Sequence, residues 1–139
     1  MKPFAIRRAA HLRLGRRGES LAARLLSELG LEILARNYSC AAGEIDIVAR
    51  DGERLCFVEV KTRRRAISSR PADAVGREKR RRVIRAAHRY LREIGWPDIV
   101  YRFDIVEILL AGRQVTDARH WRGAFSEERN RPGLSLPST

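Results

Sequence analysis

Four charged side chains, Glu44, Asp46, Glu59 and Lys61, stand in two short segments that alternate polar and apolar residues. Such alternation indicates β-strands. Three carboxylates brought together form an oxygen-rich site, which suits Mg²⁺ or Mn²⁺. A divalent ion held there neutralises a phosphate and lowers the pKa of a water. A neighbouring ammonium orients or deprotonates that water, or stabilises charge on the phosphate. The chemistry indicated is phosphodiester hydrolysis.

The two segments flank Asp51-Gly52, a dipeptide typical of a tight hairpin turn. If these two residues form the loop, Asp46 faces Phe57. Glu44 then faces Glu59. Because side chains alternate between the faces of a strand, this pairing places the three acids and the lysine on one face. The opposite face is apolar and should pack against a core. It carries Ile45, Ile47, Cys56, Val58 and Val60.

The pattern of Asp46, twelve residues, then Glu59-x-Lys61 is loose by itself, because Glu-Val-Lys on a strand is usually a solvent-facing charged stripe. Three features favour a functional interpretation. The acids share a face in the predicted hairpin, the pattern lies in an alternating series of helices and strands, and a basic block begins at its last residue. The carbonyl of Val60 is a candidate further ligand.

The positive charge of the chain is concentrated in one block. The 139 residues carry a formal net charge of +12. Residues 61 to 92 contain 13 basic and two acidic residues, a net charge of +11, against +2 for residues 1 to 60 and −1 for residues 93 to 139. A field of this size favours a polyanionic partner, with nucleic acid first and an anionic membrane surface second.

The elements that position these residues follow from periodicity and turn signals. We expect a basic N-terminal arm at 1–14, a single domain at 15–125 and a disordered tail at 126–139. Within the domain we expect a helix from Gly15 to a stop at Gly30, with an apolar stripe of Leu21, Ala22, Leu25, Leu26 and Leu29. The later elements are a strand at 31–38, a turn at 39–42, the hairpin, a loop at 67–71, a helix at about 73–94, a strand at 99–109 and a candidate short edge strand at 115–121.

The second helix is the main basic element. Its buried stripe should be Val83, Ile84, Ala87, Leu91 and Ile94. Its other faces hold one acid, Glu78, among many arginines, and like charges four residues apart destabilise a helix. We therefore expect this face to meet phosphate. The candidate nucleic-acid-binding residues are Arg63, Arg64, Arg65, Lys79, Arg80, Arg81, Arg82 and Arg85.

Two further acids have more than one interpretation. Glu19 lies in the first turn of the first helix, where it either complements the helix dipole or points into a site. Glu44 is a carboxylate that supports the ligands, a partner for an arginine, or a third ligand. Asp104 is expected to be structural and to pair with Arg102 or a neighbour. We expect Cys56 to be a core residue, because it lies on the apolar face of its strand. No cysteine or histidine spacing indicates a zinc site.

The sequence resembles the YraN family (UPF0102) of bacterial proteins, itself predicted to be related to archaeal Holliday-junction resolvases. The segments that carry the resemblance are GRRGESLAARLL, RNYSCAAGEIDIVARDGERLCFVEVKTRRR, the helix at 79–90 and RFDIVEI. It covers about residues 15 to 125 and implies an α/β fold with a restriction-endonuclease-like core, a PD-(D/E)xK site and the order α-β-β-β-α-β(-β). It also implies that Asp46 and Glu59 are metal ligands, Lys61 the lysine and Glu19 a helix-borne acid. Ile45 stands where the PD pattern has a proline.

Two functions are compatible with these residues. The first is a metal-dependent DNA endonuclease, with Mg²⁺ or Mn²⁺ as cofactor, that acts on branched or junction DNA. The second is a nucleic-acid-binding protein with a vestigial site. A third, weaker interpretation sends the basic face to anionic lipid. No signal peptide or long apolar run is present, so we expect a cytoplasmic protein that has no membrane partner. A homodimer is expected if the substrate is a four-way junction.

Overall fold

The computed structural model describes residues 16–64 and 76–127 of the chain. In order, the elements are α1 (Arg16–Glu28), β1 (Glu32–Cys40), β2 (Gly43–Asp51), β3 (Arg54–Arg63), α3 (Arg77–Glu93), β4 (Val100–Ala111) and β5 (Gln114–Phe125). This order confirms the predicted series of helices and strands. The final strand is longer than the short edge strand expected from the sequence. The predicted arm at 1–14, the loop at 67–71 and tail residues 128–139 lie outside the described residues.

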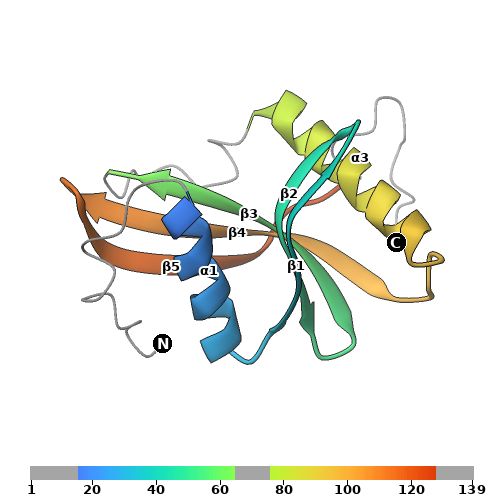
Figure 1. Cartoon of the computed structure of the whole chain (residues 1–139), viewed down its shortest axis with the longest axis horizontal. Helices are drawn as coiled ribbons and strands as arrows, with labels where there is room; N and C mark the ends of the chain where they lie inside the picture. Colours follow the sequence, from blue (N-terminus) through green and yellow to red (C-terminus); the bar gives the residue numbers. More distant parts are fainter. Residues whose placement is uncertain (1–15, 65–75, 128–139) are drawn as a thin grey trace, which may run out of the picture.

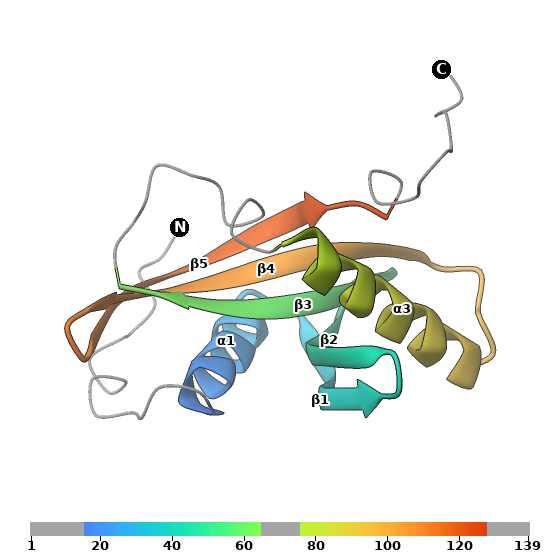
Figure 2. The ribbon, with the colours of Figure 1, turned by 90° about the horizontal axis from the view of Figure 1, so that it is seen from above.

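The five strands form one mixed sheet in the order β1-β2-β3-β4-β5. All neighbouring strands are antiparallel except β3 and β4, which are parallel. A parallel pair requires a crossover connection, and α3 lies within that connection. In Figures 1 and 2 the β1–β2 hairpin lies between the two helices. The architecture is therefore a mixed α/β fold in which both helices pack on the sheet.

Helix α1 covers one of two separate core clusters. Its side chains Leu21, Leu25 and Leu26 are buried at helical spacing, as predicted. They pack with strand residues that include Ile47 and Val58. Leu29, the predicted end of the stripe, is 38% exposed. The helix has already ended at Glu28, so Leu29 no longer follows its period.

Helix α3 covers the other cluster. Val83, Ile84, Ala87 and Leu91 are buried, which confirms four members of the predicted stripe. They pack with strand residues that include Phe57, Phe103 and Ile105. Ile94 was expected in this stripe but is 46% exposed, because it is the C-cap residue and lies past the last helical turn. The central strands thus bury side chains on both faces.

The β2–β3 hairpin turns at Gly52-Glu53, so the predicted Asp51-Gly52 loop is wrong. Asp51 pairs with Arg54 and leaves two residues between them. Gly52 has a φ of +60°, as the first loop position of a type II′ turn requires, whereas an Asp-Gly loop forms a type I′ turn. The predicted partners of Phe57 and Glu59 are therefore wrong. The register moves by two positions, and a shift of two keeps each side chain on its face.

Counted from the hairpin turn, strand β2 separates from β3 at Asp46. The last paired residues are Ile47 and Val58. Ile47 lies in the cluster under α1, whereas Ile45 lies in the cluster under α3. The predicted apolar face is thus confirmed for Ile47, Cys56, Val58 and Val60 but is wrong for Ile45. The separation of the strands at Asp46 is where the candidate site lies.

Candidate active site

Asp46 stands where β2 and β3 separate. One of its carboxylate oxygens, Oδ2, accepts a hydrogen bond of 2.8 Å from the backbone N–H of Val60. The side chain thereby satisfies a donor on β3 beyond the last paired residues of the two strands. This bond fixes the carboxylate of Asp46 beside Glu59, which precedes Val60 in the same strand.

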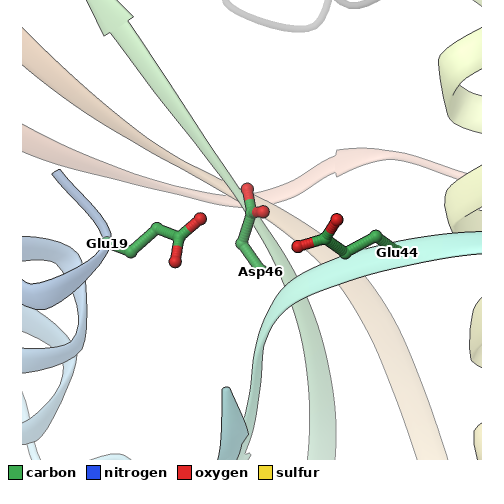
Figure 3. Close-up of side chains that lie close together, drawn as sticks. All are labelled: Glu19, Glu44 and Asp46. Atoms are coloured by element: carbon green, nitrogen blue, oxygen red, sulfur yellow. The ribbon is translucent and has the colours of Figure 1, made fainter. Parts of the chain in front are cut away.

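Three carboxylates from two elements meet at this point. Glu19 comes from the first turn of α1, and Glu44 and Asp46 come from β2. One oxygen from each lies within 4.8 Å of the other two. Figure 3 shows Asp46 between Glu19 and Glu44. Partial burial, with the charge of Asp46 as the second cause, raises the pKa of Glu19 above its ordinary value. The structure thus brings the helix acid to the strand acids.

Glu59 adds a fourth carboxylate, and it is the most buried of the four. Its side chain is 4% exposed, and its Oε1 lies 2.7 Å from Nζ of Lys79 in an ion pair. The other oxygen, Oε2, is buried and has no hydrogen-bond partner among the described residues. Burial, reinforced by the charge of Asp46, raises the pKa of Glu59 to about 7, although Lys79 opposes that shift. A buried carboxylate oxygen without a donor is an energetic defect unless something else binds it.

A cavity of about 680 Å³ contains three of these acids. It is lined by the β1–β2 turn, by Glu44, Asp46 and Glu59, and by Lys79, Arg82 and Val83 of α3. The turn packs closely on the helix: a Cβ at Gly43 would lie 3.0 Å from both Cβ and the backbone oxygen of Arg82. A side chain at position 43 would require the turn or the helix to shift, so the close contact sets the wall of the cavity.

Lys61, the lysine of the sequence pattern, lies outside this cavity. It follows Glu59 by two residues on β3 and is half-buried. Its neighbour in the parallel register is Glu107 of β4. Among the residues that line the cavity, the one lysine is Lys79. The geometry therefore places Asp46 and Glu44 in two overlapping groups, with Glu59 in the cavity and with Glu19 in the cluster of three carboxylates. Lys61 does not line the cavity.

The predicted nucleic-acid-binding residues divide into three groups. Arg64, Lys79, Arg82 and Arg85 are exposed, and Arg80 and Arg81 are half-buried. Arg65 lies outside the described residues. Arg63 is buried: its Nε lies 3.3 Å from Oε2 of Glu107, and both side chains are at most 5% exposed. The expectation that Arg63 contacts nucleic acid is corrected, because β3 continues to Arg63 and turns its side chain inward.

Lys79 is the site residue whose contact with Glu59 the sequence did not predict. It was expected on the phosphate-binding face because it belongs to an arginine run. The helix begins at Arg77, so Lys79 lies in the first turn, next to the end of the β1–β2 hairpin. A signal was present in the sequence: Lys79 is the one lysine of the helix, and a lysine stem is long and flexible enough to reach a buried acid.

Several similar proteins are known. Residues 18–108 match the model of a family described as "Uncharacterised protein family UPF0102". "UPF0102 protein Franean1_1156" of Parafrankia sp. (strain EAN1pec) is 49% identical over 113 residues, which cover 81% of this chain and 96% of that protein. A "UPF0102 protein" of Streptomyces griseus is 50% identical over 111 residues, 79% of this chain and 93% of that protein. In the described part of the chain, no helix has the length and apolar character needed to cross a membrane.

Proposed function

This chain belongs to the UPF0102 family, and from that premise we propose that it is a metal-dependent endonuclease that hydrolyses phosphodiester bonds in DNA. The observation that carries the proposal is the buried, unpartnered Oε2 of Glu59, in a cavity that also contains Asp46 and Glu44. The proposal includes a restriction-endonuclease-like core. Its support is the antiparallel series β1–β3, followed by a helical crossover to the parallel strand β4, with the acids where β2 and β3 separate.

The residues fit a hard divalent cation such as Mg²⁺ or Mn²⁺. All candidate ligands are carboxylate oxygens, the donor type that these ions prefer. Asp46 and Glu59 would hold the ion, and Glu44 and Glu19 are close enough to add negative charge or a ligand. The ion supplies a water of lowered pKa and neutralises charge on the phosphate.

The chain itself contributes position and charge. The Val60 N–H holds Asp46 in place, and the half-buried Lys61 is proposed to orient the attacking water or to stabilise negative charge on the phosphate. Arg82 lines the cavity and Arg85 lies one turn further along α3, so both are placed to hold the backbone of a substrate on either side of the cleaved bond. Arg64 and Arg81 extend the same proposal.

Cleavage of labelled junction, flap and linear DNA in the presence of Mg²⁺ or Mn²⁺ tests this function. We expect Asp46→Asn to lower the rate by at least about a hundredfold, because it weakens the ion's hold. Lys61→Ala should also lower it. Asp117→Asn is the control, since Asp117 is a partly exposed acid on β5 that pairs with Arg119. Cleavage that survives in the Asp46 and Lys61 variants would refute these roles.

A second function is favoured by two observations. Lys79 already neutralises Glu59, and Lys61 does not line the cavity. Both fit a protein that binds nucleic acid with its arginines and does not cut it. In that case binding should weaken steeply with salt, and chelators and Asp46→Asn should leave the affinity unchanged. Arg85→Gln should reduce the slope of log affinity against log salt by about 0.9. Arg113→Gln, at the exposed β4–β5 turn, is the charge-matched control.

A further inference from the structure

The ion pair of Lys79 with Glu59 joins two very different environments. Nζ of Lys79 lies 2.7 Å from Oε1 of Glu59, and the Lys79 side chain is 54% exposed whereas that of Glu59 is 4% exposed. The carboxylate is thus fixed in the floor of the cavity, while the ammonium reaches it from the solvent side. Lys79, the one cation in contact with the buried acid among the described residues, is therefore the partner that can leave.

The charge around this pair favours a cation at the position of the ammonium. Glu44 and Asp46 line the same cavity, and their negative charges act on Lys79 in addition to that of Glu59. In the metal-free protein Lys79 therefore supplies the positive charge that a cluster of acids needs.

We propose that Lys79 is an exchangeable counter-ion, which holds Glu59 in the metal-free protein and is displaced from it when a divalent cation binds. The inference rests on the proposed function, because it assigns Glu59 to the metal site. A divalent ion and an ammonium compete for the same carboxylate, since two cations bound to one carboxylate would lie only a few ångströms apart and repel each other. Lys79 is a positioning residue in this scheme, acting through Glu59.

Lys79 has the physical properties that exchange requires. Its ammonium is a strongly hydrated point charge on a flexible stem, and more than half of the side chain faces solvent, so it can leave without repacking the core. Arg82 also lines the cavity, but its Nε lies 3.9 Å from Oε1 of the exposed Glu78, on the helix surface. Displacement of Lys79 frees Oε1, which joins the unpartnered Oε2 as a ligand.

Titration of the full chain with Mn²⁺ in a calorimeter measures the affinity for the ion and tests the exchange without any cleavage step. Removal of a competing cation should tighten binding, so we expect Lys79→Met to bind Mn²⁺ about tenfold more tightly than the wild type. Arg92→Met is the matched control: it removes one positive charge from the same helix at an exposed position that does not line the cavity, and screening by salt should keep its effect small. An unchanged or weaker affinity in Lys79→Met would overturn the proposal, as would the absence of Mn²⁺ binding to both proteins.

A second pair of variants shows whether the effect passes through Glu59. In a Glu59→Gln background, Lys79→Met should no longer change Mn²⁺ affinity, and a persistent tightening would overturn the competition at Glu59. The cleavage assay separates this inference from the proposed function. If DNA is cut but Lys79→Met leaves Mn²⁺ affinity unchanged, the exchange alone is wrong. If Lys79→Met tightens Mn²⁺ binding but no DNA is cut, the nuclease function alone is wrong.

Discussion

Two buried acids on neighbouring strands, Asp104 of β4 and Glu59 of β3, are treated in opposite ways by this fold. Asp104 is fully buried and accepts hydrogen bonds from Nε of Arg102 at 3.0 Å and from the Gly123 N–H at 2.9 Å, and it lies 2.8 Å from Nε2 of His120. Among the described residues, Glu59 has one ion-pair partner, Lys79, and one of its oxygens has no donor. Similar burial therefore does not mean a similar role.

The pKa values of the two acids also shift in opposite directions. Burial alone would raise the pKa of Asp104, but its hydrogen bonds with His120, Arg102 and Gly123 outweigh burial and lower that pKa. For Glu59 burial and Asp46 prevail, and its pKa rises to about 7. A carboxylate surrounded by donors ties strands together, as the sequence led us to expect for Asp104. A carboxylate such as Glu59, with no donor to one of its oxygens among the described residues, keeps an affinity for a cation.

The largest expected effect is that of Asp104→Asn on stability. The amide preserves the shape but removes the charge, which leaves His120 and Arg102 beside a buried neutral group, although Arg102 keeps its ion pair with Asp51 at 2.9 Å. Loss of one partner of a buried ion pair costs about 3–5 kcal/mol. Urea denaturation monitored by circular dichroism should show this fall in the free energy of unfolding. A loss below about 1 kcal/mol would mean that the Asp104 network contributes little to the fold.

The equivalent change at the other acid, Glu59→Gln, should raise the free energy of unfolding at high pH, whereas Asp104→Asn lowers it. The size of the Glu59 effect should depend on pH. The pKa of Glu59 rises from an ordinary 4.5 to about 7 on folding. Between these values the folded state binds the proton and the unfolded state does not, so the contribution of Glu59 to stability is largest below about pH 4.5 and is lost as pH rises through 7. We expect Glu59→Gln to remove about 3 kcal/mol of that fall, at about 1.4 kcal/mol for each pKa unit. Unfolding free energies at pH 4.5 and pH 8 measure it, and a wild-type curve parallel to that of the variant would contradict it.

Metal-induced stabilisation should distinguish the two acids next. At ten times its Kd, Mn²⁺ should stabilise the wild type by roughly 1.4 kcal/mol, because it binds only the folded state. Asp104→Asn should show the same increment from its lower starting point, whereas Glu59→Gln should show much less. Thermal unfolding with and without Mn²⁺ gives both values. An increment that disappears in Asp104→Asn would place the metal elsewhere.

The smallest expected effect is that of Gly43→Ala, which probes the wall of the Glu59 cavity. The added methyl would lie 3.0 Å from the backbone oxygen of Arg82 and should push the β1–β2 turn away from α3. We expect a loss of about 1 kcal/mol in stability, together with weaker Mn²⁺ binding. Gly76→Ala is the matched control, since a Cβ there would meet no atom within 4 Å. Equal effects of the two changes would show that the contact with Arg82 does not hold the cavity together.

Much of the fold follows from local sequence signals. Helical periodicity predicted α1 and α3, and alternation predicted the strands, because each element has an apolar face that must be buried. The turn at Gly52-Glu53 was misplaced by one residue, since Asp-Gly and Gly-Glu both suit two-residue loops and only the pairing of Asp51 with Arg54 decides between them. The error did not separate Asp46 from Glu59, because the two strands part at Asp46 and the Val60 N–H holds the Asp46 carboxylate against β3.

The site was predicted in part. The hairpin pattern located Asp46 and Glu59, and the family resemblance implied Glu19. The position of Lys79 depends on where α3 crosses the β1–β2 hairpin, and no local pattern records that packing. Arg63 was misjudged for the same reason: its partner Glu107 is 44 positions away in the sequence and becomes a neighbour only when β3 and β4 pair in parallel.

The hydrogen bond from the Val60 N–H immobilises the Asp46 carboxylate before any ligand arrives. A side chain that is already ordered loses no rotamer freedom on binding, so its conformational entropy was lost when the chain folded. The affinity of this site for a ligand therefore depends partly on how β2 separates from β3, because that separation positions Asp46. Substitutions along those strands that never touch a ligand should therefore change how tightly one is held.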